Sequence, residues 1–267
     1  MFDSLDFGLG MPWVMGALFI ALRLGAALAM LAEVGRGIVP ARTRLAMVLV
    51  LTICLDLSLG GVTVAVPTGP AWPASLLIMA AREVVLGSSL GLAVRLINSA
   101  VQMAGDLVGL SMGLSLATLF DQTAGELPLA TGRLFGLVAS LMFFAMGGHL
   151  VVVAGLFAHL KAYPVGVDHI VLPSLTALSQ ALSDSVETAV ILAAPVLVVS
   201  LLLNVAMGFV MRLVPSVNLF NIGVGVLMVG GFVALAFESA AMRVSIDRQI
   251  EELPERMDDL AGQGVPP

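Results

Sequence analysis

Three long stretches of this chain contain no Asp, Glu, Lys or Arg, and this feature limits the possible folds more than any other. They are residues 134–158, 189–211 and 219–237. A helix needs about 20 mostly apolar residues to cross the roughly 30 Å hydrocarbon core of a bilayer. Since hydrocarbon offers no partners to main-chain polar groups, a helix is the simplest conformation for such a stretch. We therefore predict three membrane helices here.

Three further apolar stretches are interrupted by a few charges. They are residues 11–32 around Arg23, 45–66 around Asp56, and 74–103 around Arg82, Glu83 and Arg95. Together the six stretches predict an all-α polytopic membrane protein built from helical hairpins with about six hydrophobic helices. Composition agrees, because 59% of the 267 residues are hydrophobic and 11% are charged, against about 25% charged residues in soluble domains. These values exclude an ordinary soluble enzyme.

The arginines in the loops between the apolar stretches predict on which side of the membrane each loop lies. Residues 33–44 carry three arginines, whereas 57–73 and 162–186 carry no Lys or Arg, which places the first loop in the cytoplasm. Six simple crossings would then place the C-terminal tail outside, which its three arginines oppose. Either one stretch does not cross, or part of the bundle is not surrounded by lipid.

Pro195 lies inside an uncharged stretch and is expected to kink that helix.

The only polar block is residues 247–267. With the preceding Arg243 it holds six acidic residues and three arginines, and the net charge of the chain is −6. This balance opposes binding to nucleic acid. Cys54 is the single cysteine, so the chain has no internal disulfide, and we expect its thiol to be buried and inert. No cofactor or metal pattern is present.

Glycines recur every four residues in two places. Gly87 and Gly91 form one pair, and Gly105, Gly109 and Gly113 form a longer series. Small residues at this spacing line one side of a helix and let two helix backbones approach closely in a membrane. The partner helix can belong to the same chain or to another subunit, and the spacing does not distinguish the two.

Charged residues inside apolar stretches need a reason, because each costs about 2.5–3.5 kcal/mol at the centre of a membrane helix. Arg23, Arg82, Glu83 and Arg95 should therefore face protein or water. Pairing with a structural role is the simpler interpretation. An ion or proton pathway is the alternative, although the acidic residues are scattered.

One sequence pattern points to catalysis. Residues 109–113 fit G-x-S-x-G, which marks a nucleophile when a strand precedes it, and here no strand is predicted. An intramembrane serine protease could instead pair Ser111 with His149. A glycine-rich apolar sequence produces this pattern easily by chance.

Residues 211–223 read MRLVPSVNLFNIG and resemble the Arg-x-x-Pro-x-x-Asn-x-Phe segment of the FliR family, the export-gate R subunit of flagellar type III secretion. The resemblance is collinear over most of the chain. It includes LRLGAALAMLAEVGRGIVPARTRLAM (22–47), REVVLGSSLGL (82–92), AGDLVGLSMGLSLATLFD (104–121) and GGHLVV (147–152). The chain departs from the family pattern at Ser216, where Gln is common, and at Gly225, where Pro is common.

The resemblance implies a structural subunit of the inner-membrane export gate in the flagellar basal body, with no covalent chemistry. It implies FliP and FliQ as partners, together with FlhB and FlhA, and unfolded proteins as substrates. In this family the subunits form a helical assembly partly raised out of the bilayer, which would explain the conflicting topology. The R subunit resembles a P-like part, here 1–184, fused to a Q-like hairpin, here 185–246, and followed by the tail 247–267.

The family's pore plug corresponds to residues 109–121. The resemblance therefore assigns plug roles to Gly109, Met112, Gly113, Leu114, Leu116, Leu119 and Phe120, which combine glycine mobility with an apolar seal. Structural or subunit-contact roles are expected for Arg23, Pro40, Arg44, Arg82, Glu83, Gly87, Gly91, Gly105, Asp106, Arg212, Pro215, Asn218 and Phe220.

Two other identities stay open at this point. The T subunit of a virulence injectisome shares the fold and the mechanism. A secondary transporter would bind a small substrate near the middle of the membrane at broken helices, for which Pro195 is the only indication.

Overall fold

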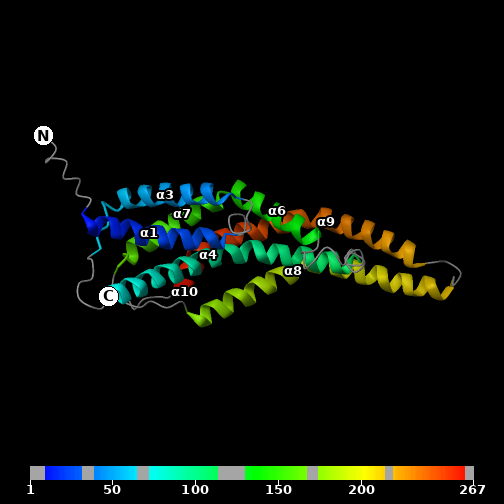
Figure 1. The fold of residues 1–267 in the computed structure, drawn as a ribbon. Helices are drawn as coiled ribbons and strands as arrows, with labels where there is room; N and C mark the ends of the chain where they lie inside the picture. The colour runs from blue at the N-terminus through cyan, green and yellow to red at the C-terminus, as the bar shows by residue number, and fades with distance from the viewer. Residues whose placement is uncertain are drawn as a thin grey trace. The chain divides into compact units, whose positions relative to one another are not determined.

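The computed structural model describes residues 10–31, 39–64, 72–113, 130–166, 174–213 and 219–261, and Figure 1 shows the helices that they form. Helices are the regular secondary structure of these residues, which confirms the all-α prediction. They are α1 (Met11–Met30), α3 (Ala41–Ser58), α4 (Trp72–Ser111), α6 (Ala130–Ala145), α7 (Gly148–Ala162), α8 (Leu175–Leu213), α9 (Leu219–Glu251) and α10 (Leu253–Ala261).

Each of the six predicted apolar stretches contains helix. Within the described residues, three helices are long and apolar enough to cross a membrane, namely α1, α4 and residues 175–210 of α8, and α6 with α7 can form a fourth span. At 1.5 Å per residue, the 40 residues of α4 extend about 60 Å. This is twice the thickness of a hydrocarbon core, so α4 reaches beyond the core unless it is steeply tilted.

The stretch 134–158 differs from its prediction as one helix. It divides into α6 and α7, which bend by 68° at the break between them. Gly147 lies at the break with a φ of +79°, a left-handed conformation that glycine adopts without steric cost. By contrast, α8 continues as a helix through Pro195.

Close contacts group the chain into two units. Unit 1 contains residues 1–95, 149–181 and 252–267, and unit 2 contains residues 96–148 and 182–251. These units are defined by contacts alone. The division at residue 185 into P-like and Q-like parts is a statement of resemblance and stays a prediction.

In unit 1, a buried carboxylate shapes the turn that follows α3. Asp56 is 1% exposed; its Oδ2 accepts a hydrogen bond of 2.8 Å from the indole Nε1 of Trp13, and its Oδ1 accepts one of 2.8 Å from the main-chain N–H of Val62. A charge at this position is therefore tolerated because its oxygens are hydrogen-bonded.

The prediction that Cys54 is buried is wrong, since this residue is exposed on α3.

The polar tail contains a second packing element that the sequence analysis overlooked. Helix α10 buries one apolar side, where Leu253, Met257 and Leu260 are at most 2% exposed. Glycine makes room for it, because a Cβ at Gly155 of α7 would lie 2.9 Å from the sulfur of Met257. On the other side of this amphipathic helix, Glu255, Asp258 and Asp259 are exposed.

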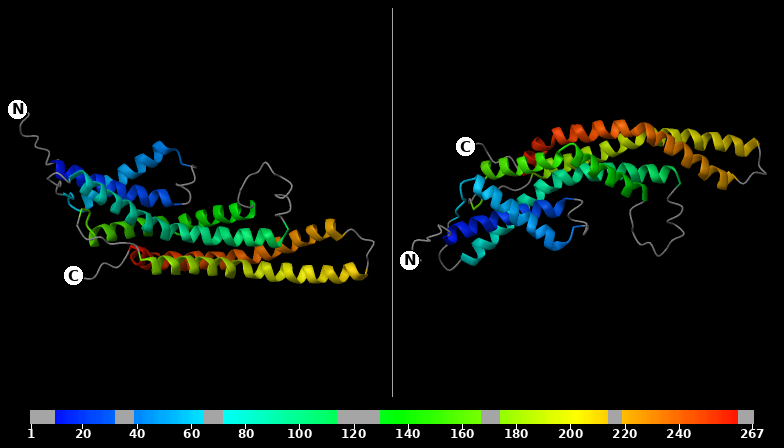
Figure 2. Two further views of the ribbon diagram at one scale, coloured as in Figure 1. Left: turned by 60° about the horizontal axis from the view of Figure 1, so that its bottom comes forward. Right: turned by 90° about the horizontal axis from the view of Figure 1, so that it is seen from above.

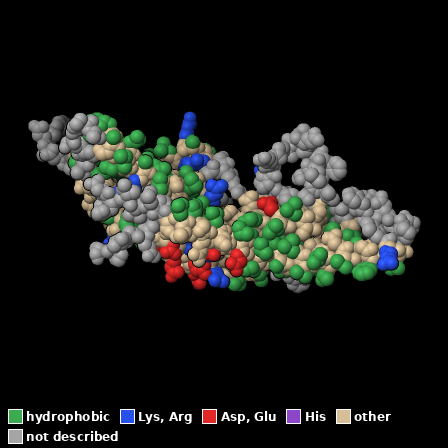
Figure 3. Space-filling view, turned by 90° about the horizontal axis from the view of Figure 1, so that it is seen from below, with side chains coloured by type: hydrophobic (Ala, Val, Ile, Leu, Met, Phe, Trp, Pro, Cys, Tyr) green, Lys and Arg blue, Asp and Glu red, His purple; other side chains and the backbone are tan. Residues whose placement is uncertain are grey.

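The surface keeps many large apolar side chains exposed. Hydrophobic side chains cover much of the face in Figure 3, and the Asp and Glu side chains gather in a few places. On α8 alone, Ile191, Leu201 and Leu202 are each more than 60% exposed. Such a surface requires lipid or partner subunits around it.

Candidate functional site

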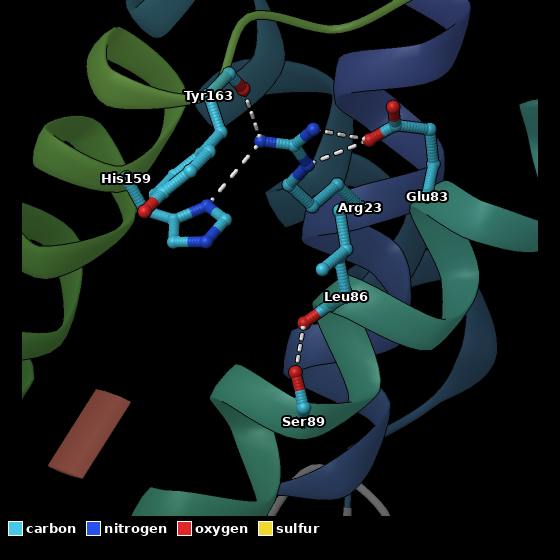
Figure 4. Close-up of polar contacts among 6 residues, drawn as sticks. All are labelled: Arg23, Glu83, Leu86, Ser89, His159 and Tyr163. Atoms are coloured by element: carbon cyan, nitrogen blue, oxygen red, sulfur yellow. Dashed lines mark hydrogen bonds and ion pairs between the residues drawn. The ribbon is translucent and has the colours of Figure 1, made fainter. Parts of the chain in front are cut away.

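The charged centre of unit 1 is a buried ion pair between α1 and α4. The Nε of Arg23 donates to Oε2 of Glu83 at 2.6 Å, and Nη2 lies 2.6 Å from the same oxygen, an ion-pair contact without the geometry of a second hydrogen bond. The side chains are 0% and 1% exposed. Figure 4 shows the two groups pointing toward each other. The buried charges thus compensate each other.

The C-terminal end of α7 completes the surroundings of Arg23. Nη1 donates to the main-chain oxygen of Tyr163 at 2.9 Å and lies 3.3 Å from Nδ1 of His159 (Figure 4). Since an arginine nitrogen can only donate, Nδ1 of the imidazole is the acceptor. One guanidinium therefore joins three helices of unit 1.

Two glycines let α4 approach α1 at this ion pair. A Cβ at Gly87 would overlap the carbonyl oxygen of Arg23, and a Cβ at Gly91 would overlap the carbonyl oxygen of Ala27. The first glycine series therefore packs within the chain. The nearest atoms to both glycines are main-chain oxygens, which cannot move aside as a flexible side chain can.

In unit 2, the second glycine series packs α4 against α6. A Cβ at Gly105 would lie 2.6 Å from the ring of Phe135 and 2.9 Å from the Cα of Gly132, and one at Gly109 would overlap the hydroxyl of Thr131. Both views in Figure 2 show α6 lying along the second half of α4.

The start of the predicted plug is the end of α4. Gly113 follows the helix with a φ of +74°, and its N–H donates to the carbonyl of Leu110 at 3.1 Å, as glycines at helix ends commonly do. Met112 is 0% exposed, and its side chain fills the space that a Cβ at Gly231 of α9 would need. Met112 is therefore enclosed within unit 2.

Polar side chains of α4 face small residues of α6 in a regular antiparallel register, which the sequence analysis overlooked. Asn98 donates from Nδ2 to the hydroxyl of Ser140 at 2.7 Å. A Cβ at Gly136 would lie 3.7 Å from Oε1 of Gln102, and one at Gly132 would overlap Oδ1 of Asp106. We call these six residues the polar seam: Asn98, Gln102 and Asp106 on α4, with Gly132, Gly136 and Ser140 on α6.

A signal for the polar seam exists in the sequence. Polar residues recur every four residues at 98, 102 and 106, and small residues recur every four at 132, 136 and 140. Within the described part of the chain, Oδ1 of Asp106 and Oγ1 of Thr131 are buried without a hydrogen-bond partner. At its end nearest the predicted plug, the polar seam therefore has a polar atom that lacks a hydrogen-bond partner.

The other predicted site residues are dispersed. Pro40 precedes α3, and Arg44 donates from Nη2 to the carbonyl of Val39 at 3.4 Å. Arg82 is half-buried. Arg212 is exposed in the last turn of α8. Phe220 is the second residue of α9, and only its main chain is described. The remainder, Leu114, Leu116, Leu119, Phe120, Pro215 and Asn218, lie outside the described residues.

The protease pattern has no catalytic geometry around it. Ser111 ends α4, so a helix precedes it rather than a strand, and its hydroxyl donates to the carbonyl of Val108 at 2.8 Å. His149 belongs to the other contact unit and is exposed. A nucleophile elbow is therefore excluded at this position.

Comparison with known proteins agrees with the resemblance found in the sequence. The family described as bacterial export proteins, family 1, matches residues 14–253. Three similar relatives are flagellar biosynthetic proteins FliR. That of Escherichia coli (strain K12) is 29% identical over 185 residues, 69% of each chain, and that of Caulobacter vibrioides is 25% identical over 239 residues, 89% of this chain and 94% of the relative. That of Pectobacterium carotovorum is 30% identical over 154 residues, 58% of this chain and 59% of the relative's length, which is less than two thirds.

Because the family match covers most of the residues, the helices α3 to α9 and both glycine series, the chain belongs to the bacterial export proteins of family 1, the FliR family.

Proposed function

We propose that this chain is the R-type subunit of the export gate in the bacterial inner membrane and helps to form and close a channel for unfolded proteins. Its family makes it a membrane component of the flagellar export apparatus, with a non-enzymatic role. The observation that carries the proposal is the combination of that family with long apolar helices whose outward faces stay exposed. Partner subunits can cover those faces, and FliP and FliQ, with FlhB and FlhA, are the partners that the resemblance implies.

Purification tests this proposal. A tag at the C-terminus, mild detergent and mass spectrometry should recover the P- and Q-type subunits with this chain in one large particle. Deleting the gene should abolish export of flagellar proteins, and the intact gene should restore it. A lone monomer that binds a small molecule would favour a transporter instead, and export that continues without the gene would contradict the proposal.

We propose further that residues 109–121 close the resting channel. Two described features support this. Gly113 follows α4 in a left-handed conformation that favours glycine, and Met112 is enclosed by residues of unit 2. An apolar side chain that can leave such an enclosure provides a reversible seal against water and small solutes.

Replacing Gly113 by valine should make the membrane leak. The left-handed conformation costs a residue with a Cβ about 1–2 kcal/mol, which corresponds to a factor of about 5–30 in an equilibrium between closed and open states. We therefore expect uptake of a small membrane-impermeant dye to rise several-fold in cells that carry the assembled complex. Gly208→Val is the control, because a Cβ at Gly208 meets no heavy atom within 4 Å. Equal dye uptake by both variants and the wild type would contradict the closing role.

A further inference from the structure

We propose that the polar seam between α4 and α6 opens during export and that Asn98, Gln102 and Asp106 then contact the main chain of the extended substrate. This inference rests on the proposed function and adds to it a substrate-contacting surface. It is independent of the plug segment, because all six residues of the polar seam lie outside 109–121.

The first argument is the contrast between the two glycine contacts of α4. In unit 1, Gly87 and Gly91 meet main-chain atoms of α1 beside a fully buried ion pair, an arrangement that is costly to separate. In unit 2, Gly105 also packs closely, on the ring of Phe135 and the Cα of Gly132, but beside it amide and carboxyl side chains of α4 face glycine and serine on α6. When the two helices separate, such polar groups lose little hydrogen-bonding free energy, provided that water or another polar chain takes the place of α6. The polar part of the second contact is therefore better suited to reversible separation than the first contact.

The second argument is incomplete hydrogen bonding. In a membrane-spanning helix, a polar group that faces another helix is normally paired. The described buried atoms that have no hydrogen-bond partner include Oδ1 of Asp106, in the polar seam, and Oγ1 of Thr131, next to it in sequence at Gly132. The closed polar seam thus retains hydrogen-bonding capacity that an arriving main chain can use.

The third argument is the repeat distance. Four residues of an α-helix advance about 6 Å, and two residues of an extended chain advance about 6.6–6.8 Å. Side chains at 98, 102 and 106 therefore nearly match every second residue of an extended substrate. The carboxamides of Asn98 and Gln102 both donate and accept hydrogen bonds, and the carboxyl oxygens of Asp106 accept them. These groups can therefore bind main-chain groups of any sequence, as a channel for many unfolded proteins requires.

A disulfide across the polar seam tests whether it opens. A Cβ at residue 136 would lie 3.8 Å from the Cβ of Gln102, which equals the mean separation in disulfides. The experiment uses Gln102→Cys with Gly136→Cys in a Cys54→Ser background, with the complete export apparatus present. Under mild oxidant we expect at least a tenfold loss of export, and reductant should restore it. Each single cysteine variant under the same oxidant is the control.

Unchanged export after complete disulfide formation would overturn the inference. If the reduced double variant fails to export, a photocrosslinking measurement decides instead. A diazirine amino acid at position 102 should then capture a substrate stalled by a fused folded domain. The same diazirine amino acid in place of Val85, which is exposed on α4 in unit 1, should not capture the stalled substrate. Absence of an adduct at 102, or equal capture at both positions, would overturn the inference.

The outcomes separate this inference from the proposed function. If deleting the gene leaves export intact, the proposed function itself fails. If deletion abolishes export while the locked variant exports normally, only the opening of the polar seam is refuted.

Discussion

Replacing Glu83 with alanine should destabilise unit 1 by about 3–5 kcal/mol, because Arg23 would remain buried without its counter-charge. The guanidinium is 0% exposed, so water cannot reach it without local unfolding. We expect the variant to unfold at a clearly lower temperature in detergent and to accumulate poorly in membranes. Intrinsic fluorescence during heating of the purified export-gate complex measures the change.

Two further variants separate the charge from the packing in this prediction. Glu83→Gln keeps an acceptor oxygen beside Arg23 and should lose less stability than Glu83→Ala. The double variant Arg23→Met with Glu83→Leu removes both charges at similar volume and should be close to the wild type, as replaced buried ion pairs often are. If the double variant is as unstable as Glu83→Ala, the loss comes from packing or from the contacts of Arg23 with α7, and the electrostatic explanation is wrong.

Replacing Gly87 with alanine should have the second largest effect. Its new Cβ would overlap the carbonyl oxygen of Arg23 and lie 3.0 Å from the Cβ of Ala26. Main-chain atoms cannot rotate away, so α1 must shift, and overpacking of this kind costs about 1–3 kcal/mol, occasionally more. The shift also disturbs the ion pair, because the crowded carbonyl belongs to Arg23 itself.

The matched control for Gly87 is Gly208 on α8. No heavy atom lies within 4 Å of a Cβ at Gly208, so Gly208→Ala should be neutral or gain up to about 1 kcal/mol from helix propensity. Thermal unfolding of the two variants in the same detergent makes the comparison. Equal stability of both would mean that α1 adapts to the added methyl group and that the close approach at Gly87 is not required.

Hydrophobic pattern predicted the helices well, and it failed where the direction of a side chain mattered. The six apolar stretches all contain helix. Cys54 was expected to be buried and inert, yet it is exposed on α3. In a membrane protein, the faces toward lipid are as apolar as the core, so hydrophobicity alone does not indicate burial. Gly147 and Gly148 indicated the break within residues 134–158. The stretch was nevertheless predicted as one helix because it contains no charged residue.

The candidate sites were predictable only in part. The cost of a charge in hydrocarbon shows that Arg23 and Glu83 need compensation, but 60 residues separate them, and no local rule selects this partner. The glycine spacing showed that α4 makes close helix contacts, whereas the choice of α1 for one series and α6 for the other depends on the packing of the chain. Of the predicted plug, only residues 109–113 lie within the described part.

The sequence by itself determined that this chain is an all-helical membrane protein, because apolar length and charge cost are local properties. Its collinear motifs, such as residues 211–223, indicated the FliR family. The sequence also determined which residues allow close helix approach, since glycine spacing on a helix is fixed by the helix geometry. Only the tertiary structure decided that Glu83 neutralises Arg23, that α10 packs on Gly155, and that α6 covers the polar side chains of α4. These contacts join residues far apart in the chain, and their free energy depends on the fit of the surfaces rather than on either segment alone.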